Sequence, residues 1–277
     1  MYGLDVYRDI FGDDCIPDPY FVIPEHDDWP CNLWGFHLGK GVAHYILHSF
    51  TDRVVSDIAA VCTKTGGVVN ISDRKEVIDA VSVSTEEDGR QRRRAAVLIP
   101  LCNRNGEGSV LFTLRSHNVG THKGEVSFPG GHCQAGESVE DTALRETFEE
   151  VGDELGPVKV LGICQTVPAV TGTLVTPVIG FVERDVGDLT HLRPNRHEVA
   201  SVFTRTVARL TDPSYRRYED IRRPSMTGIE GAVVNYKLPT FGDPENDGQK
   251  GERIWGLTAW ILDSILTKVI KPSILRR

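Results

Sequence analysis

The sequence predicts an α/β layered sandwich with a mixed sheet, preceded by a small, mostly helical N-terminal unit. Two observations predict this fold class. From residue 95 onward, short apolar runs typical of strands alternate with amphipathic helical patterns. A charged, Gly-containing stretch at 84–94, STEEDGRQRRR, separates this part from the preceding chain. We therefore expect two domains, an accessory region of unknown role at 1–90 and a main domain at 91–277.

Little regular structure is expected before residue 36, because Pro, Asp and aromatic residues dominate there. Over 42–62, apolar residues recur at three- and four-residue steps, which predicts an amphipathic helix. The runs 68–71 and 77–83 fit either short strands or a further helix.

The main domain begins with two apolar runs, 95–102 and 109–116, whose connection NRNGEG is rich in turn residues. This pattern predicts a β-hairpin. A Gly-rich loop and an acidic helix follow. Further strands are predicted at 158–167, 176–182, 198–203 and 232–238, and a closing amphipathic helix at 254–270.

The composition limits the classes of partner. The net charge of −8 disfavours a nucleic-acid backbone, so the basic run 92–94 is best explained as part of a solvated linker. No apolar run approaches the ~18 residues that span a bilayer, so no membrane partner is expected. The six cysteines form no CxxC pair, and Cys102 and Cys164 lie in apolar runs typical of buried positions. A reducing compartment is expected, and no signal peptide is recognised.

The stretch 130–153 carries the chemistry. Eight acidic residues lie between Glu137 and Glu154, with Arg145 as the single base. Ser138 and Asp141 predict a helix start and Gly152 a stop. Such a helix is either a solvated acidic face or a site for a cation.

Helical spacing favours the cation site. Glu146, Glu149 and Glu150 are three and four residues apart and so share one helix face. Clustered carboxylate oxygens suit Mg²⁺ or Mn²⁺. The loop Pro129-Gly130-Gly131 lets the backbone approach a metal or phosphate closely, since glycine has no side chain to block it.

The full pattern resembles the Nudix box. Its elements are Gly131, five residues, Glu137, seven residues, Arg145-Glu146, two residues, Glu149-Glu150, one residue and Gly152. Asp153 departs from it, since the family usually has an aliphatic residue there. The resemblance implies the Nudix fold and a hydrolase of nucleoside diphosphates linked to another moiety.

The resemblance also implies roles for residues. It implies that Glu146, Glu149 and Glu150 ligate Mg²⁺ or Mn²⁺, with the Gly131 carbonyl as a further ligand. Arg145 would pair with Glu137 and orient the helix. A further acid should accept a proton from the attacking water. Glu198 is the candidate for this base or for a further metal ligand, with an exposed strand-edge acid as the alternative.

The preceding segment 111–131, LFTLRSHNVGTHKGEVSFPGG, resembles the coenzyme A diphosphatase branch of the family. Gly120 departs from that branch, which often has Arg there. The resemblance covers roughly 93–270. It implies hydrolysis of coenzyme A or acyl-CoA to adenosine 3′,5′-bisphosphate and (acyl-)4′-phosphopantetheine. The alternatives are hydrolysis of NADH, ADP-ribose or a related nucleoside diphosphate, and a non-catalytic nucleotide sensor or scaffold.

Four residues are expected to bind this small-molecule substrate: Arg115, Ser116, Lys123 and Gly130. A guanidinium at Arg115 can hold two phosphate oxygens, and the alternative is a structural salt bridge. The segment 215–224, YRRYEDIRRP, is interpreted as a salt-bridged loop, with binding of a 3′-phosphate and adenine as the alternative. The sequence predicts no oligomeric state.

Overall fold

The computed structural model describes residues 34–39, 42–47, 49–64, 68–72, 93–117, 123–224, 233–243 and 253–275. The chain divides into two compact units, 1–48 and 49–277. In the first unit, β1 (Trp34–Gly39) and β2 (Val42–Leu47) form an antiparallel pair. The helix predicted from residue 42 is therefore wrong over 42–47. Short apolar runs fit both helical and strand periods, and here strand pairing prevails. The run 77–83 lies outside the described residues.

The helical part of that prediction is confirmed in the second unit, where α2 spans Asp52–Lys64. Asp52 in its first turn and Lys64 in its last turn complement the helix dipole. Its buried face is Val54, Val55, Ile58, Val61 and Cys62. This face packs against β8 and α7, so α2 belongs to the core of the second unit.

The second unit is built on one mixed sheet with the strand order β11-β5-β4-β10-β8-β3. The β10–β4 and β3–β8 pairs are parallel, and the β4–β5, β5–β11 and β8–β10 pairs are antiparallel. The predicted mixed sheet is thus confirmed. The main strands are β3 (Val68–Val69), β4 (Arg94–Arg104), β5 (Glu107–Arg115), β8 (Val158–Cys164), β10 (Leu174–Val182) and β11 (Val199–Thr206). Three short strands extend it: β6 (Val126–Ser127), β7 (Gly130–His132) and β9 (Val167–Pro168).

The predicted hairpin of β4 and β5 is confirmed. Its turn has positive φ at Asn105 (50°) and Gly106 (80°). Positive φ at both central residues is typical of the tight turns that match strand twist. Both strands are buried along most of their length. The hairpin therefore forms the middle of the sheet.

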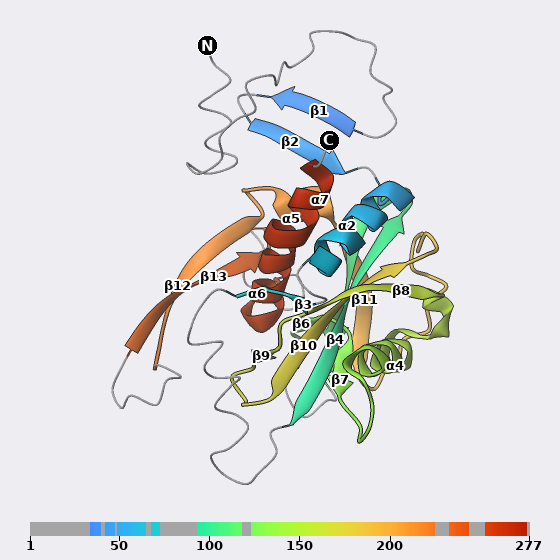
Figure 1. The fold of residues 1–277 in the computed structure, drawn as a ribbon, viewed down its shortest axis with the longest axis vertical. Coiled ribbons are helices and arrows are strands. Elements are labelled where there is room, and N and C mark those ends of the chain that lie inside the picture. Colours follow the sequence, from blue (N-terminus) through green and yellow to red (C-terminus); the bar gives the residue numbers. More distant parts are fainter. Residues whose placement is uncertain are drawn as a thin grey trace. The chain divides into compact units, whose positions relative to one another are not determined.

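Helices cover both faces of this sheet (Figure 1). The acidic helix α4 (Val139–Val151) packs Ala143 against Ala96, Leu98 and Val178 on one face. On the other face, Gly162 of β8 lies close against Cys62 of α2. A Cβ at Gly162 would be only 2.4 Å from the Cβ of Cys62. The short η2 turn (Asp153–Leu155) follows α4 and buries Leu155.

The C-terminal part adds a second sheet and the closing helix. β12 (Arg216–Pro224) pairs antiparallel with β13 (Val233–Phe241), so the loop predicted at 215–224 is in fact a strand. After the short α5 (Val207–Thr211), the remaining helix runs through α6 (Gly256–Ile265), the π-helical turn η4 (Leu266–Ile270) and α7 (Lys271–Leu275). The predicted closing helix is confirmed and extends to residue 275.

Two further expectations meet the structure here. Cys102 and Cys164 are buried and free, as predicted. Each helix in the described part of the chain is too short or too polar to span a lipid bilayer.

Candidate functional site

The acidic helix α4 is fixed at both ends by local hydrogen bonds. The Oγ of Ser138 accepts a hydrogen bond from the Asp141 backbone N–H at 3.0 Å, as the capping pattern predicted. At the other end, Gly152 adopts a φ of 105° and its N–H donates to the Phe148 carbonyl at 3.0 Å. A side chain would be strained at that φ, which explains a glycine at this position.

Arg145 is the centre of the charge network on α4. Its Nε donates to Glu137 at 2.7 Å, and its Nη1 donates to Glu146 at 2.8 Å and to Glu149 at 3.2 Å. Its Nη2 reaches the His132 carbonyl at 3.2 Å, which ties the helix to the glycine loop. The hydrogen bond from Arg145 lowers the pKa of Glu137 to about 2. One cation thus holds three carboxylates together.

The three carboxylates predicted to share one face differ in exposure. The side chain of Glu149 is 57% exposed, that of Glu146 is 17% exposed and that of Glu150 is 4% exposed. Glu150 turns toward the sheet, where its Oε2 accepts a hydrogen bond from the Gly130 N–H at 3.3 Å. Burial raises the pKa of Glu150 to about 7, against the opposing effect of the Arg115 guanidinium.

The two glycines of the loop leave room that side chains would fill. A Cβ at Gly130 would come within 2.3 Å of the Ala96 carbonyl oxygen on β4. A Cβ at Gly131 would lie 2.3 Å from a carboxylate oxygen of Glu146. Glycine at these positions therefore allows the loop to contact both the sheet and the α4 carboxylates.

A second arm of the site comes from the end of β5. The Nη1 of Arg115 lies 3.8 Å from Glu150 Oε1, and the backbone N–H of buried Ser116 donates to the Glu198 carbonyl at 2.8 Å. The charge of Glu198 also contributes to the raised pKa of Glu150. The structure thus brings Arg115, Ser116 and Glu198 to the buried end of the α4 cluster.

Lys123 takes no part in the contacts of the α4 cluster described above. It is exposed in the turn before β6. Its neighbour Gly124 has a φ of 68°, and its N–H donates to the Arg115 carbonyl at 3.1 Å. The turn that carries Lys123 is therefore anchored to the strand end that carries Arg115.

The α4 carboxylates are not gathered as a formed metal site. Among the described residues, no group of three or more His, Cys, Asp or Glu side chains stands in a metal-binding arrangement. The physical reason is visible on α4, where Arg145 takes Glu146 and Glu149 while Glu150 points to Gly130. The donor chemistry still suits a hard divalent cation, since all three groups offer carboxylate oxygens.

Two residues of 215–224 form salt bridges within the protein. Arg216 forms a salt bridge with Asp263 of α6, and Arg253 forms one with Glu219. Tyr218 Oη also donates to Asp263 at 3.2 Å. The salt-bridged interpretation of this segment is confirmed for Arg216, although the segment is a strand.

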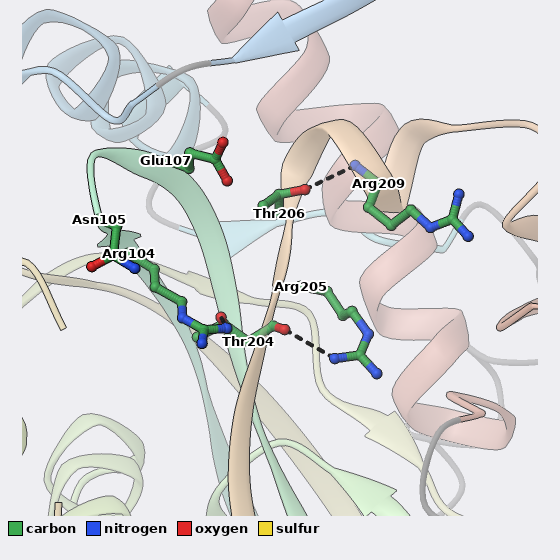
Figure 2. A pocket seen from close by; sticks show the side chains of 7 residues that line it. All are labelled: Arg104, Asn105, Glu107, Thr204, Arg205, Thr206 and Arg209. Atoms are coloured by element: carbon green, nitrogen blue, oxygen red, sulfur yellow. Dashed lines mark hydrogen bonds between the residues drawn. The ribbon is translucent and has the colours of Figure 1, made fainter. Parts of the chain in front are cut away.

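A hollow of about 320 Å³ lies at the opposite end of the β4–β5 hairpin (Figure 2). Glu107 at this hollow and Arg115 are eight positions apart on β5, a span of roughly 26 Å at ~3.3 Å per residue. Its cations are engaged: Arg104 and Arg205 donate to Thr204, and Arg209 pairs with Asp212 and Asp243. Because Thr204 is neutral, its contacts do not cancel the charges of Arg104 and Arg205, whereas Arg209 is balanced by its two aspartates.

One residue at the α4 cluster was missed by the sequence analysis. The backbone N–H of Asn195 donates to the Glu150 carbonyl at 3.0 Å. Asn after Pro194 is a turn signal, and Asn side chains often close such turns by bonding their own backbone two residues on. That signal predicts a turn, but its contact with α4 depends on the tertiary fold.

Comparison with known proteins gives consistent matches. Residues 92–223 match the family model of the NUDIX domain. The mouse protein named mitochondrial coenzyme A diphosphatase NUDT8 is 39% identical over 183 residues, which cover 65% of this chain and 79% of that protein. Nudix hydrolase 3 of Caenorhabditis elegans is 34% identical over 189 residues, covering 65% and 74%. The crystal structure of the Nudix hydrolase RenU from M. smegmatis matches 42% of this chain and 71% of that chain, with 25% identity and a TM-score of 0.34.

Proposed function

The chain belongs to the Nudix hydrolase family, and from this membership we propose that it hydrolyses the diphosphate bond of coenzyme A and acyl-CoA. The products are adenosine 3′,5′-bisphosphate and (acyl-)4′-phosphopantetheine. The observation that carries the proposal is the meeting of the α4 carboxylates, the Gly130-Gly131 loop and Arg115 in one place. The name of the mouse relative, a coenzyme A diphosphatase, supports this choice among Nudix substrates.

A divalent cation belongs to this function, and we propose Mg²⁺ or Mn²⁺. Glu146, Glu149 and Glu150 would hold it, with the Gly131 carbonyl as a further ligand. Two features of the chain fit a cation: hard oxygen donors, and a loop without side chains against the Glu146 carboxylate. When bound, the cation supplies charge neutralisation at the diphosphate and activation of a water.

The remaining residues orient and charge the site. Arg145 holds Glu137, Glu146 and Glu149 in place through its guanidinium. Glu198 is proposed to accept the proton of the attacking water, because it is exposed to solvent and its backbone is bonded to Ser116, next to Arg115. Its competitors for this role are Glu146 and Glu149 on α4.

Substrate contacts are proposed for Arg115, Ser116, Lys123 and Gly130. Arg115 offers a planar guanidinium whose Nε is buried and has no hydrogen-bond partner among the described residues, beside the carboxylate of Glu150. A phosphate oxygen would satisfy such a donor through a charge-assisted hydrogen bond. A net charge of −8 supports a small phosphorylated ligand over a nucleic acid.

A substrate panel tests the proposal. Coenzyme A, acyl-CoAs, NADH, ADP-ribose and diadenosine polyphosphates are incubated with the full chain and Mg²⁺ or Mn²⁺, and products are separated by chromatography. We expect the highest kcat/KM on a coenzyme A compound, with inhibition by adenosine 3′,5′-bisphosphate. A much higher kcat/KM on NADH or ADP-ribose would contradict the substrate assignment and leave the hydrolase class intact. No turnover of any substrate would favour a nucleotide sensor.

A further inference from the structure

The turn at Asn195 makes four hydrogen bonds that connect α4 to the residue proposed as proton acceptor. The Asn195 N–H donates to the Glu150 carbonyl at 3.0 Å. Its Oδ1 accepts from the His197 N–H at 3.1 Å. Its own carbonyl accepts from the N–H groups of Glu198 at 3.0 Å and Val199 at 2.8 Å. Both the backbone and the side chain of Asn195 therefore set the path of the chain into Glu198.

The first of these bonds meets a need of the helix. The last four carbonyls of an α-helix have no partner within the helix. The Glu150 carbonyl is one of them, because α4 ends at Val151. The Asn195 N–H satisfies it, so the turn is attached to the backbone of the buried acidic residue.

The connections form a closed ring. Beyond the turn, the Glu198 carbonyl accepts from the Ser116 N–H at 2.8 Å. The preceding residue, Arg115, returns to α4 through its Nη1, which lies 3.8 Å from Glu150 Oε1. The ring thus runs from α4 through the Asn195 turn to β5 and back to α4. A change at Asn195 would move Glu198 relative to both Glu150 and Arg115.

We propose that Asn195 is a positioning residue, which holds the turn carrying Glu198 in register with Glu150. The side-chain amide contributes the Oδ1 bond that closes the turn, and the substrate does not need to touch it. This inference rests on the proposed function, because it gives Asn195 a role only through Glu198.

A double-mutant cycle tests the proposal. Asn195→Ala removes the Oδ1 acceptor, Glu198→Gln removes the proposed proton acceptor, and the third variant carries both changes. The rates are measured with the full chain on the best substrate of the panel, at saturating metal. Misplacement of a catalytic group by about 1 Å can cost on the order of 10²-fold, so we expect Asn195→Ala to lower kcat roughly tenfold to a hundredfold. If Asn195 acts through Glu198, the double variant should be no slower than Glu198→Gln alone.

Asp188→Ala is the matched control. Asp188 closes a turn of the same kind in the same connection, since its Oδ1 accepts from the Thr190 N–H at 3.0 Å and from the Thr190 hydroxyl at 2.7 Å. We expect this variant to keep kcat within about twofold of wild type, with a Tm change similar to that of Asn195→Ala. Asn195→Ser, whose hydroxyl closes such turns more weakly, should recover part of kcat.

Three results would overturn the proposal. In the first, the double variant loses kcat by the product of the two single losses. In the second, Asp188→Ala loses as much kcat as Asn195→Ala. In the third, Glu198→Gln keeps the wild-type kcat. The last would also remove Glu198 from the proposed mechanism. Failure of the proposed function is distinguished by the wild-type protein, whose turnover of coenzyme A is measured before any variant.

Discussion

Two clusters of cations and carboxylates in the second unit differ in their charge balance. In the α4 cluster, the two guanidinium groups of Arg115 and Arg145 face five carboxylates, those of Glu137, Glu146, Glu149, Glu150 and Glu198. In the C-terminal cluster, two cations face one carboxylate: Arg216 and Lys271 against Asp263. The first cluster carries an excess of negative charge, and the second does not.

The difference separates a ligand site from a structural one. In the C-terminal cluster Asp263 pairs with Arg216 and also accepts a hydrogen bond from Tyr218. Burial and the charge of Arg216 lower the pKa of Lys271. In the α4 cluster, carboxylates outnumber cations beside a loop free of side chains. The excess charge is offset if a cation binds there.

The largest effect is expected from removing a carboxylate of the α4 cluster. Loss of groups that only orient metal ligands costs 10- to 100-fold, so loss of a ligand itself in Glu150→Gln or Glu146→Gln should lower kcat by roughly a hundredfold or more. The Tm without metal should not fall, because each change removes one of several clustered like charges. Glu140→Gln is the control, since it makes the same change in the first turn of α4, outside the Arg145 network. A wild-type rate in Glu146→Gln and Glu150→Gln at limiting Mg²⁺ would remove them as ligands.

An intermediate effect is expected at Arg115. A charge-assisted hydrogen bond contributes about 1.5–3 kcal/mol, which corresponds to roughly a 10- to 150-fold loss of kcat/KM in Arg115→Ala. Arg115→Lys should recover only part of this, because an ammonium group cannot hold two phosphate oxygens in a planar fork. Tm should change little. A large fall in Tm with unchanged kcat/KM would instead assign Arg115 to a structural salt bridge with Glu150.

The smallest effect on activity is expected in the C-terminal cluster. Asp263→Asn leaves the Arg216 guanidinium without its anion in a site where both side chains are largely buried. For a pair that keeps some solvent contact, we expect a loss of about 1–3 kcal/mol, or a Tm lower by roughly 3–10 °C. The kcat measured well below that Tm should stay within about twofold. A loss of kcat comparable with that of Glu150→Gln would place the C-terminal cluster in the active site.

The parts that sequence predicted well depend on local interactions. Helix α4 was predictable from Ser138 and Gly152, because capping bonds join residues a few positions apart. The network of Arg145 with Glu137 was implied by the family resemblance and is confirmed at 2.7 Å. The β4–β5 hairpin followed from two apolar runs joined by a short turn.

The parts that were missed depend on partners far away in sequence. The strand β12 is mostly charged, and it forms because β13 pairs with it. The sequence of β2 fits a helical pattern as well as a strand pattern, and its pairing with β1 makes it a strand. Glu150 is buried where the strand that includes Gly130 pairs with β4 and donates a hydrogen bond to its carboxylate. The spacing of residues within α4 gives no information about that pairing. The division of the chain at residue 90 stays a prediction, as do the roles of the candidate site residues.

The most direct test of the central claim is a titration of Mn²⁺ into the full chain, followed by electron paramagnetic resonance. We expect saturable binding by the wild-type protein, much weaker binding by Glu150→Gln, and wild-type binding by Asp263→Asn. Equal Mn²⁺ affinity in the wild type and Glu150→Gln, or loss of binding in Asp263→Asn, would contradict the claim that the excess carboxylates of α4 form the cation site.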